Sequence, residues 1–159
     1  MKPFLRRLLV VSVASLLPGC GGGSYAGYKI GGYRVKGVRY QPLSPQEAIG
    51  YTEEGVASHY QEGWFLFPGK DALGGSLYPW SSGAAHKTLP LPCVIRVTNL
   101  ENGRRAKVRV TDRGPFISDR MLDVTSPVAK KLGFYDQGLA RVRIEVLSVG
   151  DGRYRVDED

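Results

Sequence analysis

Asp112 stands at the end of a strand pattern, residues 104 to 112, where a turn that contains Pro115 begins. Counted back by twos, Val110 shares the face of Asp112, so the carboxylate is expected to end an apolar strand face. Partial burial there would raise the pKa of Asp112 towards neutral, as a general acid requires, while the adjacent Arg113 would lower it. The pattern therefore indicates an acid/base catalyst, or alternatively an ion pair that only holds a turn.

The strand that carries the acid is expected to form a hairpin with the strand before it. Residues 93 to 100 and 104 to 112 flank Asn102-Gly103, the strongest short signal for a hairpin turn. A two-residue loop at that point would place Cys93 opposite Asp112. Cys93 would then be a small buried hydrophobe that lowers the polarity around the carboxyl group.

Other local patterns predict the elements that must hold this hairpin. We expect an N-terminal hairpin within residues 25 to 43, a helical turn capped by Ser44, a first core strand over residues 55 to 60, a short helix capped by Ser126 that exits at Gly133, and a closing strand over residues 140 to 147. The polar residues 150 to 159 are expected to fray.

A long connection, residues 61 to 83, is rich in glycine and aromatic residues. A loop of this length inside a compact domain is usually functional. Its aromatic side chains would form either a stacking platform for sugar rings or a small satellite core. They are Trp64, Phe65, Phe67, Tyr78 and Trp80.

Composition favours a single β-rich domain. The 159 residues are 42% hydrophobic and include 21 Gly and 10 Pro, and the valine-rich runs alternate with polar residues. The formal net charge is +7, but no aromatic-plus-basic motif accompanies it, so nucleic acid is not an expected partner. A cationic surface facing an anionic envelope polymer fits the charge equally well. The sequence contains no Cys/His cluster, and we expect neither metal nor cofactor.

The N-terminus reads as an export signal. Basic residues precede an apolar segment, residues 8 to 17, which is too short for a permanent membrane span. The segment ends in Leu17-Pro18-Gly19-Cys20, which resembles the bacterial lipoprotein box, with cleavage before Cys20 and lipidation of its thiol. Palmitate is expected among the lipids of such a protein. Because Gly21 rather than Asp follows, the analogy favours the outer membrane. The alternative is an ordinary secretory signal with an incidental cysteine.

Four blocks of the sequence, taken in order, resemble one known family. They are Gly55–Tyr60, Ala84–Pro90, Arg96–Gly103 and Asp112–Phe116. Over roughly residues 25 to 148 the chain is similar to the rare lipoprotein A family. This resemblance implies a six-stranded double-psi β-barrel with one or two short helices and an N-terminal hairpin extension. It also implies a septal lytic transglycosylase (a lyase) that cleaves peptidoglycan strands stripped of stem peptides and leaves 1,6-anhydro ends.

The resemblance also implies an organisation and a location. We expect a signal peptide over residues 1 to 19, a lipidated Cys20 and Gly-rich tether over 20 to 27, an N-terminal extension over 28 to 52, the barrel over 53 to 149 and a polar tail over 150 to 159. No SPOR domain, which many longer members carry, is expected in this chain. The expected location is the periplasmic face of the outer membrane, with glycan strands as substrate and septal proteins as candidate partners.

By position, His86 and Asp112 match the catalytic histidine and aspartate of the family. The family also places a Glu and an Asp eleven and eight positions before that histidine, where this chain has Gly75 and Tyr78. Asp112 alone would then protonate the leaving oxygen and accept the proton of the muramic acid 6-hydroxyl. Asp71 and Glu62 are candidates to replace the missing pair, although no spacing selects them.

The other candidate site residues would bind substrate: Tyr60, Tyr78, Lys87 and Arg113. The two cations among them would meet acidic lactyl groups. His86 would hydrogen-bond the sugar or orient Asp112, or else it is a structural histidine that bonds a neighbouring loop. Two functions stay open: an enzyme that cuts naked glycan, or a catalytically degenerate barrel that binds denuded glycan or septal partners without cleaving.

Overall fold

A computed structural model describes residues 30–60, 68–150 and 154–155 of the chain. Its helices are α1 (Pro45–Ala48) and α2 (Ser126–Leu132). Its strands are β1 (Tyr33–Val35), β2 (Val38–Tyr40), β3 (Thr52–Tyr60), β4 (Gly69–Lys70), β5 (Ser76–Leu77), β6 (Ala84–His86), β7 (Cys93–Asn99), β8 (Arg105–Asp112), β9 (Arg120–Thr125), β10 (Leu139–Val149) and β11 (Tyr154–Arg155).

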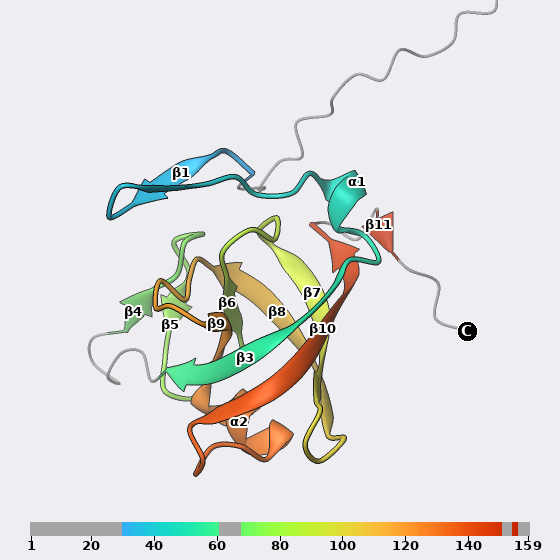
Figure 1. Cartoon of the computed structure of the whole chain (residues 1–159). Helices are drawn as coiled ribbons and strands as arrows, with labels where there is room; N and C mark the ends of the chain where they lie inside the picture. The colour runs from blue at the N-terminus through green and yellow to red at the C-terminus, as the bar shows by residue number, and fades with distance from the viewer. Residues whose placement is uncertain (1–29, 61–67, 151–153, 156–159) are drawn as a thin grey trace, which may run out of the picture.

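Six of these strands close into a barrel (Figure 1). The neighbours run in the order β10, β3, β9, β6, β8, β7, and β10 then pairs with β7 to complete the circle. Two of the pairings, β3 with β9 and β6 with β8, are parallel, and the others are antiparallel. Closure leaves the barrel without an open sheet edge. The predicted fold class, a six-stranded double-psi β-barrel, is confirmed.

The barrel interior is filled by the alternating apolar residues of the long strands. Those fully buried include Ile95 and Val97 of β7, Val110 of β8, and Val142 and Ile144 of β10. Burying the side chain of a Val or Ile stabilises a fold by about 1.5–3 kcal/mol, so these rows provide a large part of the driving force for closure. The predicted closing strand is confirmed, and β10 is long enough to pair with both β3 and β7.

The β7–β8 hairpin differs from its predicted register by two residues. Cys93 pairs with Val110 and not with Asp112. The connection contains four residues, 100–103, because the backbone N–H of Asn99 donates to the carbonyl of Arg104. The side chains of Asn99 and Asn102 donate to the carbonyl of Leu132, the last residue of α2 (3.1 and 3.0 Å).

This contact with a helix end, which local turn chemistry does not reveal, accounts for the longer loop. A shift of two residues returns every side chain to its original face, so the apolar faces still coincide. Cys93 is buried as expected, and burial raises the pKa of its thiol to about 12.

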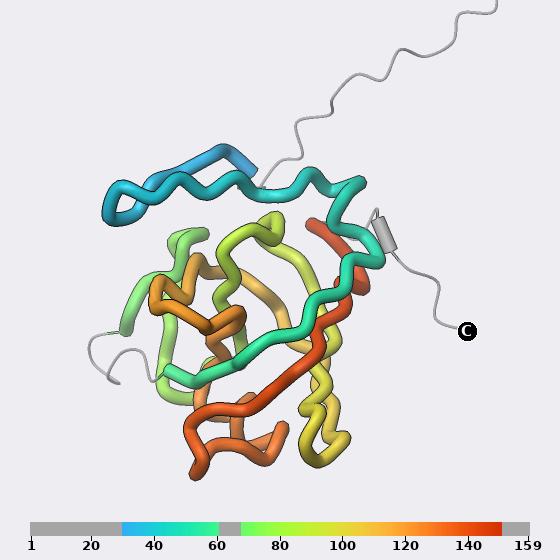
Figure 2. Tube along the Cα trace, in the orientation of Figure 1, coloured from blue at the N-terminus to red at the C-terminus, as the bar shows by residue number. Residues whose placement is uncertain are grey.

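Residues 30–51 lie across one end of the barrel, and α2 lies at the opposite end (Figure 2). The predicted N-terminal hairpin is formed by β1 and β2, which pair Tyr33 with Tyr40, Arg34 with Arg39, and Val35 with Val38. Ser44 caps α1 as predicted: its side chain accepts from the backbone of Glu47, whose carboxylate accepts in return from the backbone of Ser44.

Several boundaries differ from the predictions. The N-cap of α2 is Thr125, not Ser126, and the Ser126 hydroxyl instead donates to the carbonyl of Tyr60. Gly133 ends the helix in the left-handed region, as expected. Residues 154–155 were expected to fray but pair with the end of β10, so part of the tail extends the sheet. The first core strand starts at Thr52, three residues earlier than expected.

The described part of the long connection, residues 68–83, contains a small hairpin of β4 and β5. Trp64, Phe65, Phe67 and Glu62 lie outside the described residues. Within the described part of the chain, no helix has the length and apolar character needed to cross a membrane.

Candidate functional site

A pocket of about 130 Å³ lies at the end of β8, between β3, β6, β9 and the turn that follows Asp112. Its lining residues are Tyr60, Ala85, Asp112, Arg113, Gly114, Pro115, Phe116 and Asp123. Of the candidate residues, the structure thus brings Tyr60, Asp112 and Arg113 together. It also adds a carboxylate, Asp123, that was not among the candidates.

A register shift aims Asp112 into this pocket. Ala84 of β6 pairs with Val110, but Ala85 pairs with Asp112, so β8 carries one extra residue here. A bulge of this kind redirects the side chain that follows it. Val110 is fully buried in the core, whereas Asp112 is half-buried and lines the pocket. Asp112 is thus half-buried where the apolar strand face ends, as expected, but the bulge, which the sequence did not predict, separates it from Val110.

The surroundings of Asp112 favour its protonated form. One carboxylate oxygen, Oδ1, accepts hydrogen bonds from the backbone N–H groups of Arg113 (2.8 Å) and Ala72 (3.0 Å). Burial raises the pKa of Asp112 and outweighs these two bonds, which lower it; the nearby charge of Asp71 raises it further. A raised pKa was expected from the sequence, and it is the condition under which a carboxyl group donates a proton near neutral pH.

Asp123 is the second carboxylate of the pocket. Ala85 is the register partner of Asp123 on β9 as well as of Asp112 on β8. The two backbones are therefore two strand spacings apart, about 9.5 Å. The Ser58 hydroxyl donates a short hydrogen bond to Asp123 and accepts one from Arg120 (3.2 Å). The sequence did contain an indication that Asp123 is functional, because this acid interrupts the otherwise apolar residues 121 to 124.

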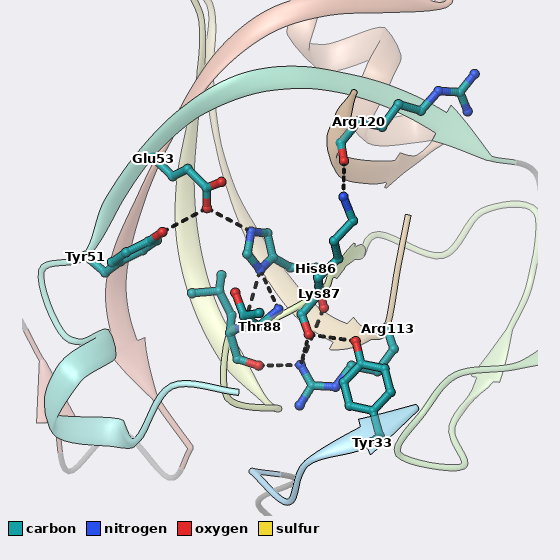
Figure 3. Close-up of polar contacts among 9 residues, drawn as sticks. Tyr33, Tyr51, Glu53, His86, Lys87, Thr88, Arg113 and Arg120 are labelled. Carbon is teal, nitrogen blue, oxygen red and sulfur yellow. Dashed lines mark hydrogen bonds and ion pairs between the residues drawn. The ribbon is translucent and has the colours of Figure 1, made fainter. Parts of the chain in front are cut away.

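His86 is buried, and both of its ring nitrogens have protein partners (Figure 3). Nδ1 accepts from the backbone N–H groups of Thr88 (3.2 Å) and Leu89 (3.1 Å). The proton of the neutral ring therefore lies on Nε2, which donates to Glu53 (3.3 Å). Tyr51 donates to the same Glu53 oxygen (3.0 Å). His86 does not line the pocket of Asp112, and its contacts match the structural alternative.

The two candidate cations also contact the backbone. The Arg113 guanidinium donates to the carbonyls of Leu89, His86 and Lys87, and it lies over the ring of Tyr33 at 5.3 Å (Figure 3). Lys87 donates to the carbonyl of Arg120 (2.6 Å). Both side chains therefore help to fix residues 86–89 beside the pocket.

Tyr78 does not line the Asp112 pocket. It stacks on Trp80 with the ring centroids 5.0 Å apart and the planes almost parallel, and Trp80 is 59% exposed.

Asp71 accepts from the backbone N–H groups of Leu73 and Gly75 and so closes the β4–β5 turn. Cys20 lies outside the described residues. Among the described residues, no group of three or more His, Cys, Asp or Glu side chains is arranged to hold a metal ion.

Comparison with known proteins shows which family this chain belongs to. A family described as lytic transglycolase matches residues 52–144. The chain is 44% identical over 122 residues to the endolytic peptidoglycan transglycosylase RlpA of Rickettsia bellii, which covers 76% of this chain and 52% of that protein. It is 46% identical over 114 residues to the protein of the same name from Pseudomonas aeruginosa. That match covers 71% of this chain and 32% of the Pseudomonas protein. The resemblance to rare lipoprotein A is confirmed. The chain spans about half the length of the Rickettsia relative.

Two solved structures are similar at lower identity. A Streptomyces papain inhibitor matches with a TM-score of 0.49 at 21% identity, covering 62% of this chain and 96% of the inhibitor. An expansin of Clavibacter michiganensis matches with a TM-score of 0.49 at 18% identity, covering 61% and 50%.

Proposed function

Because this chain belongs to the lytic transglycolase family, we propose that it acts on the glycan strands of peptidoglycan, with Asp112 as the acid/base group. The observation that carries this proposal is the position of Asp112: half-buried, with a raised pKa, in a pocket that holds a second carboxylate. The family resemblance and the names of the relatives support the substrate.

The proposed reaction needs one proton carrier. Protonated Asp112 donates to the oxygen of the glycosidic bond between C1 of a muramic acid residue and O4 of the next sugar, and that bond breaks. The C6 hydroxyl of the same muramic acid attacks C1, and the Asp112 carboxylate accepts its proton. A C1–O6 bond forms, no water is consumed, and Asp112 ends protonated as it began. One carboxyl group thus acts first as acid and then as base.

Asp123 would supply fixed negative charge. Positive charge develops on the sugar ring as the C1–O4 bond breaks, and a carboxylate already held in place stabilises it without reorganisation. The hydrogen bond from Ser58 holds Asp123 in this way. We assign Tyr60 to substrate contact, and His86 and Arg113 to positioning, because their polar atoms contact the segment 86–89.

Incubation of the purified protein with amidase-treated peptidoglycan tests the proposal. Release of products with 1,6-anhydro ends, abolished in Asp112→Asn, is the expected result. Asp119→Asn is the matched control, because Asp119 is an exposed acid that does not line the pocket. Products with ordinary reducing ends would instead indicate hydrolysis by the Asp112 and Asp123 pair.

A binding module without catalysis is the second candidate function. Gly75 and Tyr78 stand where the family has carboxylates. The stacked Tyr78–Trp80 pair, whose Trp80 is exposed, offers a flat aromatic surface suited to a sugar ring. Sedimentation of the protein with denuded glycan, without release of any product, would favour this function over transglycosylation.

We further propose that the chain is exported and anchored through a lipidated Cys20 at the outer membrane, where septal proteins are candidate partners. The basic and apolar residues before Cys20 support this proposal. Labelled palmitate should enter the protein and not its Cys20→Ala variant. Equal labelling of both would contradict lipidation at this cysteine.

A further inference from the structure

A second pocket, of about 230 Å³, adjoins the site on the far side of Phe116, which lines both pockets. One wall comes from the N-terminal hairpin through Val35, Val38 and Tyr40. The other comes from the loop that follows Asp112. We call this the hairpin pocket. It is smaller than the roughly 300–1,000 Å³ of sites that enclose whole ligands, so it suits one residue of a polymer.

Aromatic contacts fix the hairpin wall in place. Tyr33 and Tyr40 stack at 5.2 Å between ring centroids, and Phe116 packs against both, at 6.2 and 5.6 Å. The Tyr33 hydroxyl also donates to the carbonyl of Lys87 (2.7 Å; Figure 3). The hairpin is thus attached to the loop that begins at Asp112, and the pocket between them has two supported walls.

Lys36 is the unusual residue of this pocket. It occupies the turn between β1 and β2 with a φ of 48°, followed by Gly37 at 82°. Gly, Asn and Asp are the residues favoured at such a position, and a lysine there is strained. Within the described part of the chain, its ammonium group has no hydrogen bond or ion pair. A strained residue beside a cleft suggests that its side chain is required there.

The remaining lining complements Lys36. Lys87 supplies a second ammonium group, which uses one hydrogen on the Arg120 carbonyl. None of the described residues that line the pocket carries a carboxylate. Its rim exposes apolar side chains, since Phe116 is 37% and Ile117 57% exposed. Ammonium groups beside exposed aromatic and aliphatic surface match a ligand with both a carboxylate and a sugar face.

We propose that the hairpin pocket is a subsite for a muramic acid residue next to the bond held at Asp112, and that Lys36, with Lys87, binds its free lactyl carboxylate. This inference rests on the proposed function. A stem peptide would convert the lactyl carboxylate into an amide and remove the charge. The pocket therefore selects glycan without stem peptides at this position.

Two glycans of equal length test this subsite. One is a peptide-free tetrasaccharide of alternating N-acetylglucosamine and N-acetylmuramic acid, and the other is chitotetraose, which has no lactyl group. Calorimetric titration of the full chain, carrying Asp112→Asn so that nothing is cut, should give roughly 10- to 150-fold tighter binding of the first, since a charge-assisted hydrogen bond contributes about 1.5–3 kcal/mol.

Lys36→Gln should remove most of that preference. Arg34→Gln is the matched control, because it removes one charge from the same hairpin on the face that points away from Phe116. Lys36→Asn is the second variant: asparagine suits the left-handed turn, so the hairpin should fold at least as well while the preference is still lost.

The outcomes separate the two proposals. Equal effects of Lys36→Gln and Arg34→Gln would mean diffuse charge attraction and would overturn the subsite. Equal affinity of the parent protein for both glycans would overturn it as well. If the protein cuts glycan but either of these two outcomes is found, only the proposal of the hairpin-pocket subsite is contradicted. If the protein neither binds nor cuts either glycan, the proposed function is contradicted as well.

Discussion

Asp112 and Asp123 are register partners of one and the same residue, Ala85, from opposite sides of β6. The barrel therefore brings together two carboxylates that are eleven residues apart in the chain. Their surroundings differ, since backbone N–H groups hold Asp112 and a hydroxyl group holds Asp123. This difference is the basis for giving them different roles.

Asp123→Asn should slow the release of 1,6-anhydro ends by about 10²-fold, which is typical for the loss of one preorganised electrostatic contact. The affinity for denuded glycan should change little, because the charge on the sugar develops only as the bond breaks. Rates and dissociation constants measured on the same preparation check this. An unchanged rate would exclude Asp123 from the reaction.

Asp112→Asn should stabilise the protein at neutral pH. A carboxyl group whose pKa is raised in the folded state opposes folding once the pH exceeds its unfolded pKa, because the unfolded chain ionises more readily. Asparagine removes this cost and keeps an oxygen for the N–H groups of Arg113 and Ala72. Melting temperatures should be higher for the variant at pH 7 and should converge below about pH 4. A lower melting temperature for the variant at pH 7 would contradict a raised pKa of Asp112 in the folded protein.

His86→Ala should destabilise the fold by roughly 3 kcal/mol, because the N–H groups of Thr88 and Leu89 lose their acceptor in a buried place. His86→Asn should lose less, since its amide oxygen can accept from one of them. Denaturant unfolding of both variants measures this. A histidine that served catalysis alone would leave the free energy of unfolding unchanged.

Asn99→Ala should cost about 1–3 kcal/mol of stability, since Asn99 is buried and its side chain joins the β7–β8 loop to the end of α2. Asn102→Ala is the matched comparison, because Asn102 donates to the same Leu132 carbonyl from an exposed position and should cost less. Equal losses would show that burial of Asn99 is not what fixes the loop. Thermal unfolding of the two variants side by side measures the difference.

The alternation of residues along β7, β8 and β10 was enough to predict which side chains fill the barrel. Alternation is a local property with a period of two. The register predicted at Cys93 was wrong by two residues, and a shift of two residues leaves each side chain on its predicted face. Alternation did not predict the direction of the Asp112 side chain. The extra residue in β8 is defined only by the pairing of β8 with β6, a strand far from it in the sequence. Pairing between distant strands is not encoded in any single stretch of sequence.

For a similar reason, the sequence left the role of His86 open between catalysis and a structural contact, and it did not predict the backbone contacts of Arg113. Their residue types suit catalysis and the binding of anions, and the family resemblance pointed the same way. The structure gives their polar atoms backbone partners on residues 87–89, which depend on how the β6–β7 connection folds. Asp123 was overlooked because a single acid between apolar residues gives only a weak signal.

The pairing of β1 with β2 joins identical residues: tyrosine with tyrosine, arginine with arginine and valine with valine. Arg34 and Arg39 therefore repel each other across the strands, and an isolated two-stranded hairpin is at best marginally stable in water. The edge-on and tilted contacts of Tyr33 and Tyr40 with Phe116 have to offset this repulsion. We therefore expect the hairpin to open as a separate unit, at a lower free energy than the barrel, whenever it loses its contact with the loop that begins at Asp112.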